Sequence, residues 1–233
     1  DHWAMYTDYN SLFSNWLLVQ EHKNTTKLIA IYRKLQIFAG YNTSSLMEKI
    51  GIFCSASNRL PSVYVETTRQ LGEWLGKEKK TIIYGGANLG LMEDIASAAK
   101  ANGATLIGVV PKILEKNGKV STLPDRLIHT VNLSDRKDVI VEESDILVAL
   151  PGGIGTLDEV FHVMAASTIG YHHKKVIFYN VNGFYDTLLK ALQQMAQAQF
   201  IRGLEKNEYY LVANSFNELI NILKKPNLTD NND

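Results

Sequence analysis

Apolar residues along this chain follow two alternating patterns from about residue 50 onward. Short unbroken apolar runs, which are typical of strands buried on both faces, alternate with longer segments in which apolar residues recur every three or four positions, as on one face of a helix. The apolar runs predict strands over Ile50–Cys54, Thr81–Tyr84, Thr105–Val110, Leu127–Val131, Ile146–Leu150, Val176–Tyr179 and Tyr209–Ala213. The periodic segments predict helices over Val63–Lys79, Leu91–Ala101, Asp135–Glu143, Leu157–Thr168, Phe184–Gln199 and Phe216–Lys224. This alternation predicts an α/β fold with a doubly wound parallel sheet flanked by helices.

The two ends of the chain do not follow this alternation. Residues 1–46 contain two stretches with helical character, Tyr9–Gln20 and Lys27–Phe38, and Met47 stands immediately before the first predicted strand. Either this segment is an appended extension, or it is a helical arm that packs on the domain or on a partner, and the sequence leaves both open. We expect an N-terminal extension over residues 1–46, one α/β domain over 47–225 and a frayed tail over 226–233.

Composition narrows the class of protein. The 233 residues are 45% hydrophobic and 21% charged, with a formal net charge of zero, which is ordinary globular composition without a basic stripe for nucleic acid. The single cysteine excludes a disulfide framework and fits a reducing compartment. We find neither the roughly 18–20 consecutive apolar residues of a membrane span nor a signal peptide. These features predict a cytoplasmic protein with no nucleic-acid or membrane partner.

The stretch from Ile146 to Thr168 dominates the sequence. Its apolar run leads directly into Pro151-Gly152-Gly153-Ile154-Gly155-Thr156 and then into a helix. Glycines let the backbone approach a ligand, and the free N–H groups at a helix N-terminus attract negative charge. The strand, the glycine turn and the helix together therefore predict a cradle for an anion.

Glu159 follows this cradle in the first turn of the predicted helix. The apolar stripe expected to pack on the sheet consists of Leu157, Val160, Phe161, Met164, Ala165 and Thr168. Glu159 is about 200° around the helix from Leu157, so we predict that its carboxylate points away from the core, into a cleft or toward another subunit. A first-turn glutamate often only compensates the helix dipole, but the neighbouring anion cradle favours a catalytic role.

A second glycine turn, Gly85–Gly90, also follows a predicted strand. Neither turn matches the dinucleotide fingerprint or ends in the Gly-Lys-Ser/Thr of a P-loop, so an NAD-dependent oxidoreductase and an NTPase are both disfavoured. A compact phosphate, such as that of a mononucleotide, remains as the expected ligand at the carboxyl ends of the strands.

The other candidate groups are weaker. His162, His172 and His173 lie near one another in the sequence, but no acid or cysteine completes a metal-ligand spacing, so no metal site is predicted. Cys54 has no obvious histidine base and is expected to pack at a strand end.

Arg136 and Lys137 form a basic pair in the first turn of a predicted helix, for which Ser134 is the expected N-cap. Cations are mildly unfavourable at this position because of the helix dipole. A pair held there for an anionic ligand explains the position better than a solvated pair does.

These motifs resemble one known family. The segment Pro151–Glu159 fits the PGGxGTxxE signature of the LOG (lonely-guy) cytokinin riboside 5′-monophosphate phosphoribohydrolases. Gly85–Met92 resembles the GGGxxGLM turn of that family, Ile52–Ser57 is similar to its first strand and CGSS turn, and Arg136-Lys137 resembles its arginine-lysine pair. The resemblance extends from about Ile50 to Leu223, with the motifs in order and at similar spacing.

The resemblance implies a Rossmann-like, nucleotide-binding domain and a homodimer with active sites near the subunit interface. It implies hydrolysis of the N-glycosidic bond of a nucleoside 5′-monophosphate, as in cytokinin biosynthesis, to free base and ribose 5-phosphate, with no cofactor. By the same resemblance Arg136 and Glu159 would be the catalytic pair. The residues that would bind the substrate are Ser55, Gly86, Lys137, Gly152, Gly153, Gly155, Thr156 and Asp158.

The chain departs from the family pattern near the expected base pocket. Leu133-Ser134-Asp135 stands where the family often has Met-His before its basic pair, Ser55 replaces the glycine of the CGSS turn, and Ala87 replaces a third glycine. AMP or another purine nucleotide is therefore kept beside cytokinin nucleotides as the expected substrate.

Two other functions were weighed. Similar folds carry a phosphorylated pterin, the molybdenum cofactor, without hydrolysing it, and such a carrier needs the glycine cradle but not the Arg136/Glu159 pair. The pair therefore favours an enzyme over a carrier. A lysine decarboxylase, a label sometimes given to this family, would need a Schiff-base lysine with a partner for the pyridinium nitrogen, and the sequence shows no such setting.

Overall fold

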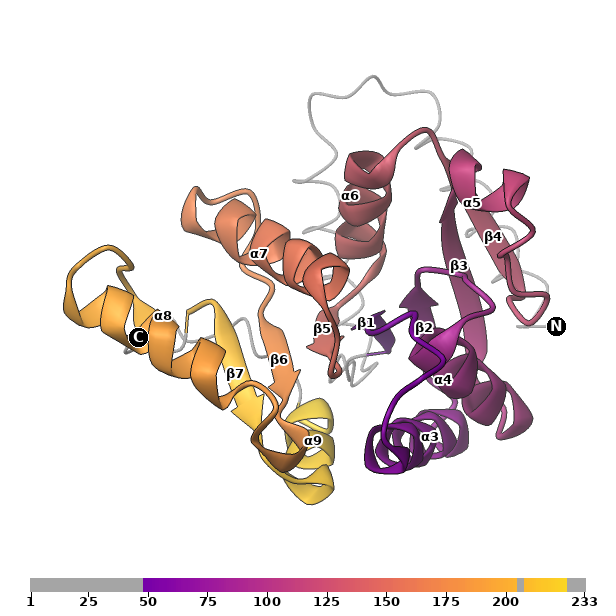
Figure 1. The fold of residues 1–233 in the computed structure, drawn as a ribbon, viewed down its shortest axis with the longest axis horizontal. Helices are drawn as coiled ribbons and strands as arrows, with labels where there is room; N and C mark the ends of the chain where they lie inside the picture. The colour runs from indigo at the N-terminus through magenta and orange to yellow at the C-terminus, as the bar shows by residue number, and fades with distance from the viewer. Residues whose placement is uncertain (1–47, 205–207, 226–233) are drawn as a thin grey trace, which may run out of the picture. The chain divides into compact units, whose positions relative to one another are not determined.

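The structure of the chain is a computed structural model, and it describes residues 48–204 and 208–225 (Figure 1). The predicted extension over residues 1–46 and the predicted tail over residues 226–233 lie outside the described residues. The predicted α/β domain therefore falls almost wholly within the described part of the chain.

One parallel sheet of seven strands forms the centre of this domain, in the order β4-β3-β2-β1-β5-β6-β7. Its strands are β1 (Lys49–Phe53), β2 (Thr81–Tyr84), β3 (Thr105–Pro111), β4 (Arg126–Thr130), β5 (Ile146–Ala149), β6 (Val176–Tyr179) and β7 (Tyr210–Ala213). The four residues of β5 are all buried, as expected for a strand covered on both faces.

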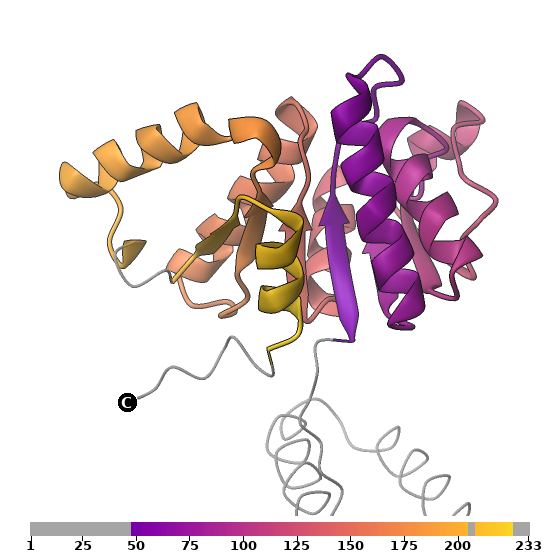
Figure 2. The same cartoon turned by 90° about the horizontal axis from the view of Figure 1, so that it is seen from below.

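Helices cover both faces of the sheet (Figures 1 and 2). One core lies between the sheet and α3 (Ser62–Lys77), α4 (Gly90–Ala101) and α9 (Phe216–Leu223). The other lies between the opposite face and α6 (Leu133–Glu143), α7 (Ile154–Thr168) and α8 (Asp186–Gln197). A short helix, α5 (Lys112–Lys116), and a 3-10 turn, η1 (Val181–Gly183), complete the described helices. The predicted doubly wound α/β fold is confirmed.

The elements predicted within the described residues are all present, and their ends agree within two residues except at α7, which begins three residues earlier than expected. One local prediction is wrong. The N-cap of α6 is Asn132 rather than Ser134, because the Asn132 side-chain oxygen accepts hydrogen bonds from the N–H groups of Ser134 (2.7 Å) and Asp135 (3.0 Å).

The face of α7 that packs on the sheet also differs from the prediction. Its buried residues are Thr156, Glu159, Val160, Val163 and Met164. Of the predicted stripe only Val160 and Met164 are buried, whereas Phe161 is 39% exposed. Apolar residues occur on two sides of α7, so the sequence did not define which side packs on the sheet. Glu159 lies on the side that does, contrary to our prediction that it faces away from the core.

The topology brings three loops together. All seven strands are parallel, so their carboxyl ends share one edge of the sheet, and β1 lies between β2 and β5. Here the strand order reverses, which in doubly wound sheets opens a crevice for a ligand. The loops after β1, β2 and β5 meet at this point.

Candidate active site

A cavity of about 280 Å³ opens at this crevice. It is lined by residues from the loop after β1, from the glycine turn and from the first two turns of α4, α6 and α7: Cys54, Ser55, Ala56, Met92, Leu133, Arg136, Lys137, Gly153, Gly155, Thr156, Asp158 and Glu159. Most of the residues predicted to form the site are thus brought to one place from three distant parts of the sequence.

The glycine turn before α7 is shaped to leave its N–H groups open. A Cβ atom on Gly152 would lie 2.1 Å from Oγ1 of Thr156, so Gly152 makes room for the buried Thr156 side chain. A Cβ on Gly153 or Gly155 would have no neighbour within 4 Å. No side chain caps the helix at Gly153, so the first N–H groups of α7 are available to an anion.

Arg136 and Glu159 form a buried ion pair in the wall of the cavity. Nη1 of Arg136 lies 2.7 Å from Oε1 of Glu159, and their side chains are only 11% and 7% exposed. Nε of Arg136 also donates a hydrogen bond to the carbonyl oxygen of Val109 at the end of β3 (3.2 Å). Two fixed contacts therefore hold the guanidinium plane, and the guanidinium in turn holds the carboxylate.

Gly85 provides the space for this arrangement. A Cβ at Gly85 would lie 2.0 Å from Nη2 of Arg136 and 2.9 Å from the sulfur of Met92. The sequence predicted a ligand contact at the adjacent Gly86, which instead has a positive φ of 66° and packs against Val110. The first glycine of the pair thus lets the Arg136 guanidinium approach the backbone just after β2.

The buried position of Glu159 alters its acidity. Loss of water raises the pKa of the Glu159 carboxyl above its usual value, and the nearby Arg136 guanidinium only partly offsets this rise. A carboxyl group with a raised pKa beside an open cavity is typical of a catalytic acid or base.

Lys137 and Asp158 form a second ion pair at the rim of the cavity. Nζ of Lys137 donates to both carboxylate oxygens of Asp158, at 2.9 and 2.8 Å, and the Asp158 side chain is 55% exposed. The pair joins α6 to α7 and places both charges where a ligand could reach them.

The structure separates the predicted site residues into two groups. Ser55, Lys137, Gly153, Gly155, Thr156 and Asp158 line the cavity with the Arg136–Glu159 pair, whereas Gly86 and Gly152 are not among the lining residues. Four lining residues were not predicted as site residues: Cys54, Ala56, Met92 and Leu133. Met92 and Leu133 belong to first helical turns after loops already singled out, and this was the signal that could have found them.

Two weaker candidates are placed differently. Cys54 lines the cavity, but it is buried, and loss of water raises the pKa of its thiol, which disfavours a thiolate; it packs at the end of β1, as predicted. Nε2 of His162 lies 2.8 Å from Asp138 on the outer side of α6 and α7. Within residues 48–204 and 208–225, no three His, Cys, Asp or Glu side chains are placed to hold a metal ion.

A doubly wound sheet with a glycine anion cradle and a buried Arg–Glu pair at its switch point defines a Rossmann-like phosphate-binding protein. Known proteins narrow this class. Residues 92–223 match the model of the family described as "Possible lysine decarboxylase". A cytokinin riboside 5′-monophosphate phosphoribohydrolase of Rhodococcoides fascians is 32% identical over 66% of this chain and 78% of its own length. A protein of the same name from Arabidopsis thaliana is 31% identical over 68% of this chain and 73% of its own.

This chain belongs to the LOG family. Among solved structures, the molybdenum cofactor binding protein of Rippkaea orientalis is similar, with a TM-score of 0.58 and 26% identity over 76% of this chain and 96% of that one. The Moco carrier protein of Chlamydomonas reinhardtii, at 23% identity and a TM-score of 0.58, shares the fold.

Proposed function

We propose that this protein hydrolyses the N-glycosidic bond of a purine riboside 5′-monophosphate, either AMP or a cytokinin nucleotide, to free base and ribose 5-phosphate. The observation that carries this proposal is the buried Arg136–Glu159 pair beside an open glycine cradle. Relatives that share the family are named for this reaction.

The 5′-phosphate binds first in the proposed mechanism. The N–H groups at the start of α7 and the open space above Gly153 and Gly155 receive it, and Lys137 adds a positive charge at the rim. Anchoring this remote group positions the reacting carbon of the ribose, so the binding energy of the phosphate contributes to catalysis.

Glu159 then acts on the sugar. Departure of the base builds positive charge on the ribose ring in an oxocarbenium-like state, which an ionised carboxylate stabilises. The same carboxylate orients or deprotonates the attacking water.

Arg136 fixes the carboxylate that acts on the sugar. Its Nε and Nη1 contacts to Val109 and Glu159 use part of the guanidinium fork, so the remaining N–H donors are those available to the phosphate or ribose. In this proposal Arg136 mainly positions Glu159.

The proposal is tested by incubating the protein with AMP and measuring adenine and ribose 5-phosphate. Glu159→Gln keeps the shape and one hydrogen bond to Arg136 but removes the charge, so we expect it to bind AMP and release almost no adenine. Glu142→Gln, at an exposed acid on α6, is the control and should match the parent. Parent-like turnover by Glu159→Gln contradicts the role given to this carboxylate.

The alternative is a carrier of a phosphorylated cofactor, as the name of the similar Rippkaea orientalis protein indicates. A carrier needs the cradle of Gly153 and Gly155 but has no use for a buried carboxylate that costs free energy to desolvate. Tight binding of the cofactor together with no release of adenine from AMP would favour the carrier.

The site does not fit a lysine decarboxylase, the activity suggested by the description of the matching family model. Lys137 is the lysine among the residues that line the cavity, and both carboxylate oxygens of Asp158 hold its ammonium group. This lysine is therefore engaged in an ion pair, whereas a Schiff-base lysine needs its amine free to attack the cofactor.

We also propose a homodimer with the active sites near its interface. Exposed apolar residues follow the outer side of α7, namely Ile154 (88% exposed), Phe161 (39%) and Ile169 just after it (69%). This stripe begins at the glycine cradle, so a second subunit packed on it would border the cavity. Sedimentation velocity tests the proposal, and a monomeric protein would contradict it.

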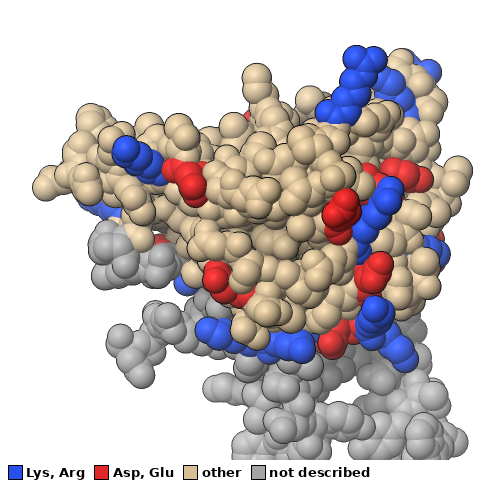
Figure 3. All heavy atoms as spheres, turned by 60° about the horizontal axis from the view of Figure 1, so that its bottom comes forward, with Lys and Arg blue, Asp and Glu red and all other residues tan. Residues whose placement is uncertain are grey.

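The remaining predictions concern partners and location. On the face shown in Figure 3, basic and acidic side chains are interspersed, which supports the prediction that nucleic acid is not a partner. No helix in the described part of the chain has the length and apolar content needed to span a membrane. The cytoplasmic location stays a prediction.

A further inference from the structure

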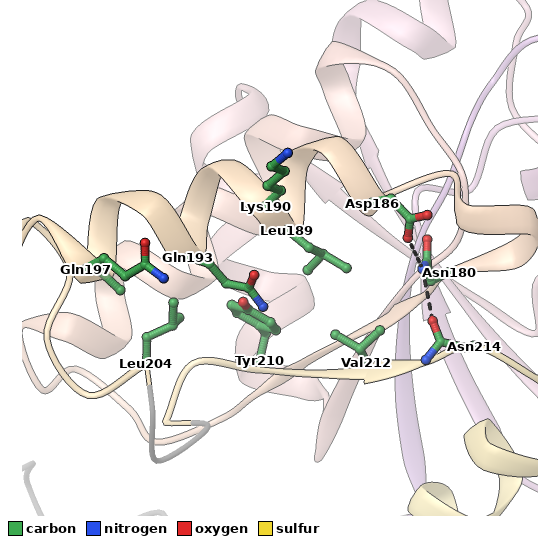
Figure 4. Close-up of a pocket in the computed structure, with 11 residues that line it drawn as sticks. Asn180, Asp186, Leu189, Lys190, Gln193, Gln197, Leu204, Tyr210, Val212 and Asn214 are labelled. Carbon is green, nitrogen blue, oxygen red and sulfur yellow. Dashed lines mark hydrogen bonds between the residues drawn. The ribbon is translucent and has the colours of Figure 1, made fainter.

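A second cavity, far larger than the first, lies at the edge of the sheet that ends with β7 (Figure 4). Its volume is about 950 Å³, and it is lined by α8, β7 and the residues that follow β6 and β7: Asn180, Asp186, Leu189, Lys190, Gln193, Ala196, Gln197, Leu204, Tyr210, Val212 and Asn214. None of these residues belongs to the proposed active site.

The cavity exists because α8 extends beyond the sheet. In Figures 1 and 2 its C-terminal half runs past β7, and its only buried residues, Leu189 and Leu192, lie within its first seven residues. Met195 and, just after the helix, Phe200 are 48% and 85% exposed. Figure 4 shows Gln193 and Gln197 pointing down from this overhanging part toward the strand.

The backbone of β7 offers hydrogen-bonding groups to this cavity. The N–H of Val176 donates to the carbonyl of Tyr209, and that of Asn180 to the carbonyl of Ala213. Together with the parallel register of β6 and β7, these bonds show that the odd-numbered residues of β7 hydrogen-bond to β6. The N–H and C=O groups of Tyr210 and Val212 therefore point outward, and no other described residue bonds to them.

The two edge strands of the sheet differ in how they are protected. β4, at the other edge, carries Arg126 and His129, and charged side chains of this kind prevent one edge from pairing with another. β7 reads Tyr-Leu-Val-Ala, with no charge and no proline. An edge of this kind is a template for another strand, and natural proteins keep it covered.

We propose that β7 pairs with β7 of a second copy of this chain around a two-fold axis, which makes one sheet continuous across two subunits. A strand is self-complementary in antiparallel pairing, so one edge serves both partners. The overhanging part of α8 would then cover the partner's strand and fill the cavity beneath it.

The charges at the edge fit a two-fold axis. Such an axis through the middle of β7 brings each central side chain close to its own copy, and like charges there would repel. The residues at this point are uncharged: Val212 on the strand and Gln193 above it on α8. A glutamine amide has both donors and acceptors, so it can bond to its own copy.

A matched pair of variants tests this interface. Gln193→Lys places two positive charges near the proposed axis, whereas Gln194→Lys makes the same change one residue along α8, at an exposed position outside the cavity lining. This interface is separate from the one proposed on α7, so the two together would join four subunits. We expect the mass in sedimentation equilibrium to fall twofold, to that of the α7 homodimer, in Gln193→Lys and to stay at the parent value in Gln194→Lys. Both should release adenine from AMP at the parent rate, so the result is independent of the proposed function.

A second variant adds no charge. Val212→Pro removes an outward N–H and leaves the hydrogen bonds to β6 in place, and we expect it to halve the mass as well. Amide hydrogen exchange at Tyr210 should be slow in the parent and fast in both variants, and exchange at Val212 should be slow in the parent and fast in Gln193→Lys. Equal masses for the parent and the three variants would overturn the proposal. Slow exchange at the amides of Tyr210 and Val212 in Gln193→Lys would also overturn it, because another segment of the chain would then cover the edge of β7.

Discussion

Replacing Gly85 by alanine tests whether the buried ion pair depends on the backbone of β2. The new Cβ would lie 2.0 Å from Nη2 of Arg136, and an ordinary contact needs at least 3.4 Å, so the guanidinium must move by about 1.4 Å. Its Nε bond to Val109 (3.2 Å) and its contact with Glu159 (2.7 Å) resist that movement.

The size of the effect follows from these contacts. Overpacking of a filled interior typically costs about 1–3 kcal/mol. At roughly 2–4 °C per kcal/mol for a chain of this size, Tm should fall by several degrees. Misplacing a catalytic group by about 1 Å costs on the order of 100-fold in rate, so we expect kcat/KM for AMP to fall by about that factor.

Gly153→Ala is the matched comparison. Its Cβ would meet no protein atom within 4 Å and its φ is −91°, so Tm should not change. Its methyl group would enter the space assigned to the phosphate, so KM should rise. Adenine release and thermal unfolding are measured on both variants. Parent-like kcat/KM in Gly85→Ala would show that the Arg136–Glu159 pair does not depend on the space at Gly85.

Two further predictions concern pH and the support of the glycine turn. Burial raises the pKa of Glu159, and its ionised form is the active one, so kcat/KM should rise with pH through an apparent pKa above the usual glutamate value of 4.5. A profile that is flat through pH 5–7, with its acid limb at or below that value, would contradict this. The hydroxyl of Tyr185 donates a hydrogen bond of 2.6 Å to the carbonyl of Leu150, just before the glycine turn. Tyr185→Phe should therefore lower the free energy of unfolding, measured by urea titration, by about 1–3 kcal/mol. An unchanged urea midpoint would show that this bond does not support the glycine turn.

The sequence was sufficient for the features that depend on local pattern. Continuous apolar runs such as Ile146–Leu150 predicted the parallel sheet, which is confirmed. The glycine turn at Gly152–Gly155 predicted an anion cradle; the structure places this turn at the switch point, and anion binding there stays a prediction. The resemblance of short motifs supplied Arg136 and Glu159, which the fold then brings to 2.7 Å.

The missing features depend on contacts between distant residues. The inward face of α7 could not be read from periodicity, because Leu157 and Phe161 offered a second apolar side that the structure leaves partly exposed. The role of Gly85 appears only when Arg136, far along the chain, is seen against it. Asn132 rather than Ser134 caps α6 because helix ends depend on backbone geometry that a list of cap-forming residues does not define.

Product analysis after incubation of the pure protein with AMP tests the central claim most directly. We predict equal amounts of adenine and ribose 5-phosphate from the parent and almost none from Glu159→Gln. Adenosine and inorganic phosphate as products, no turnover of any purine riboside 5′-monophosphate, or undiminished release of adenine by Glu159→Gln would contradict it.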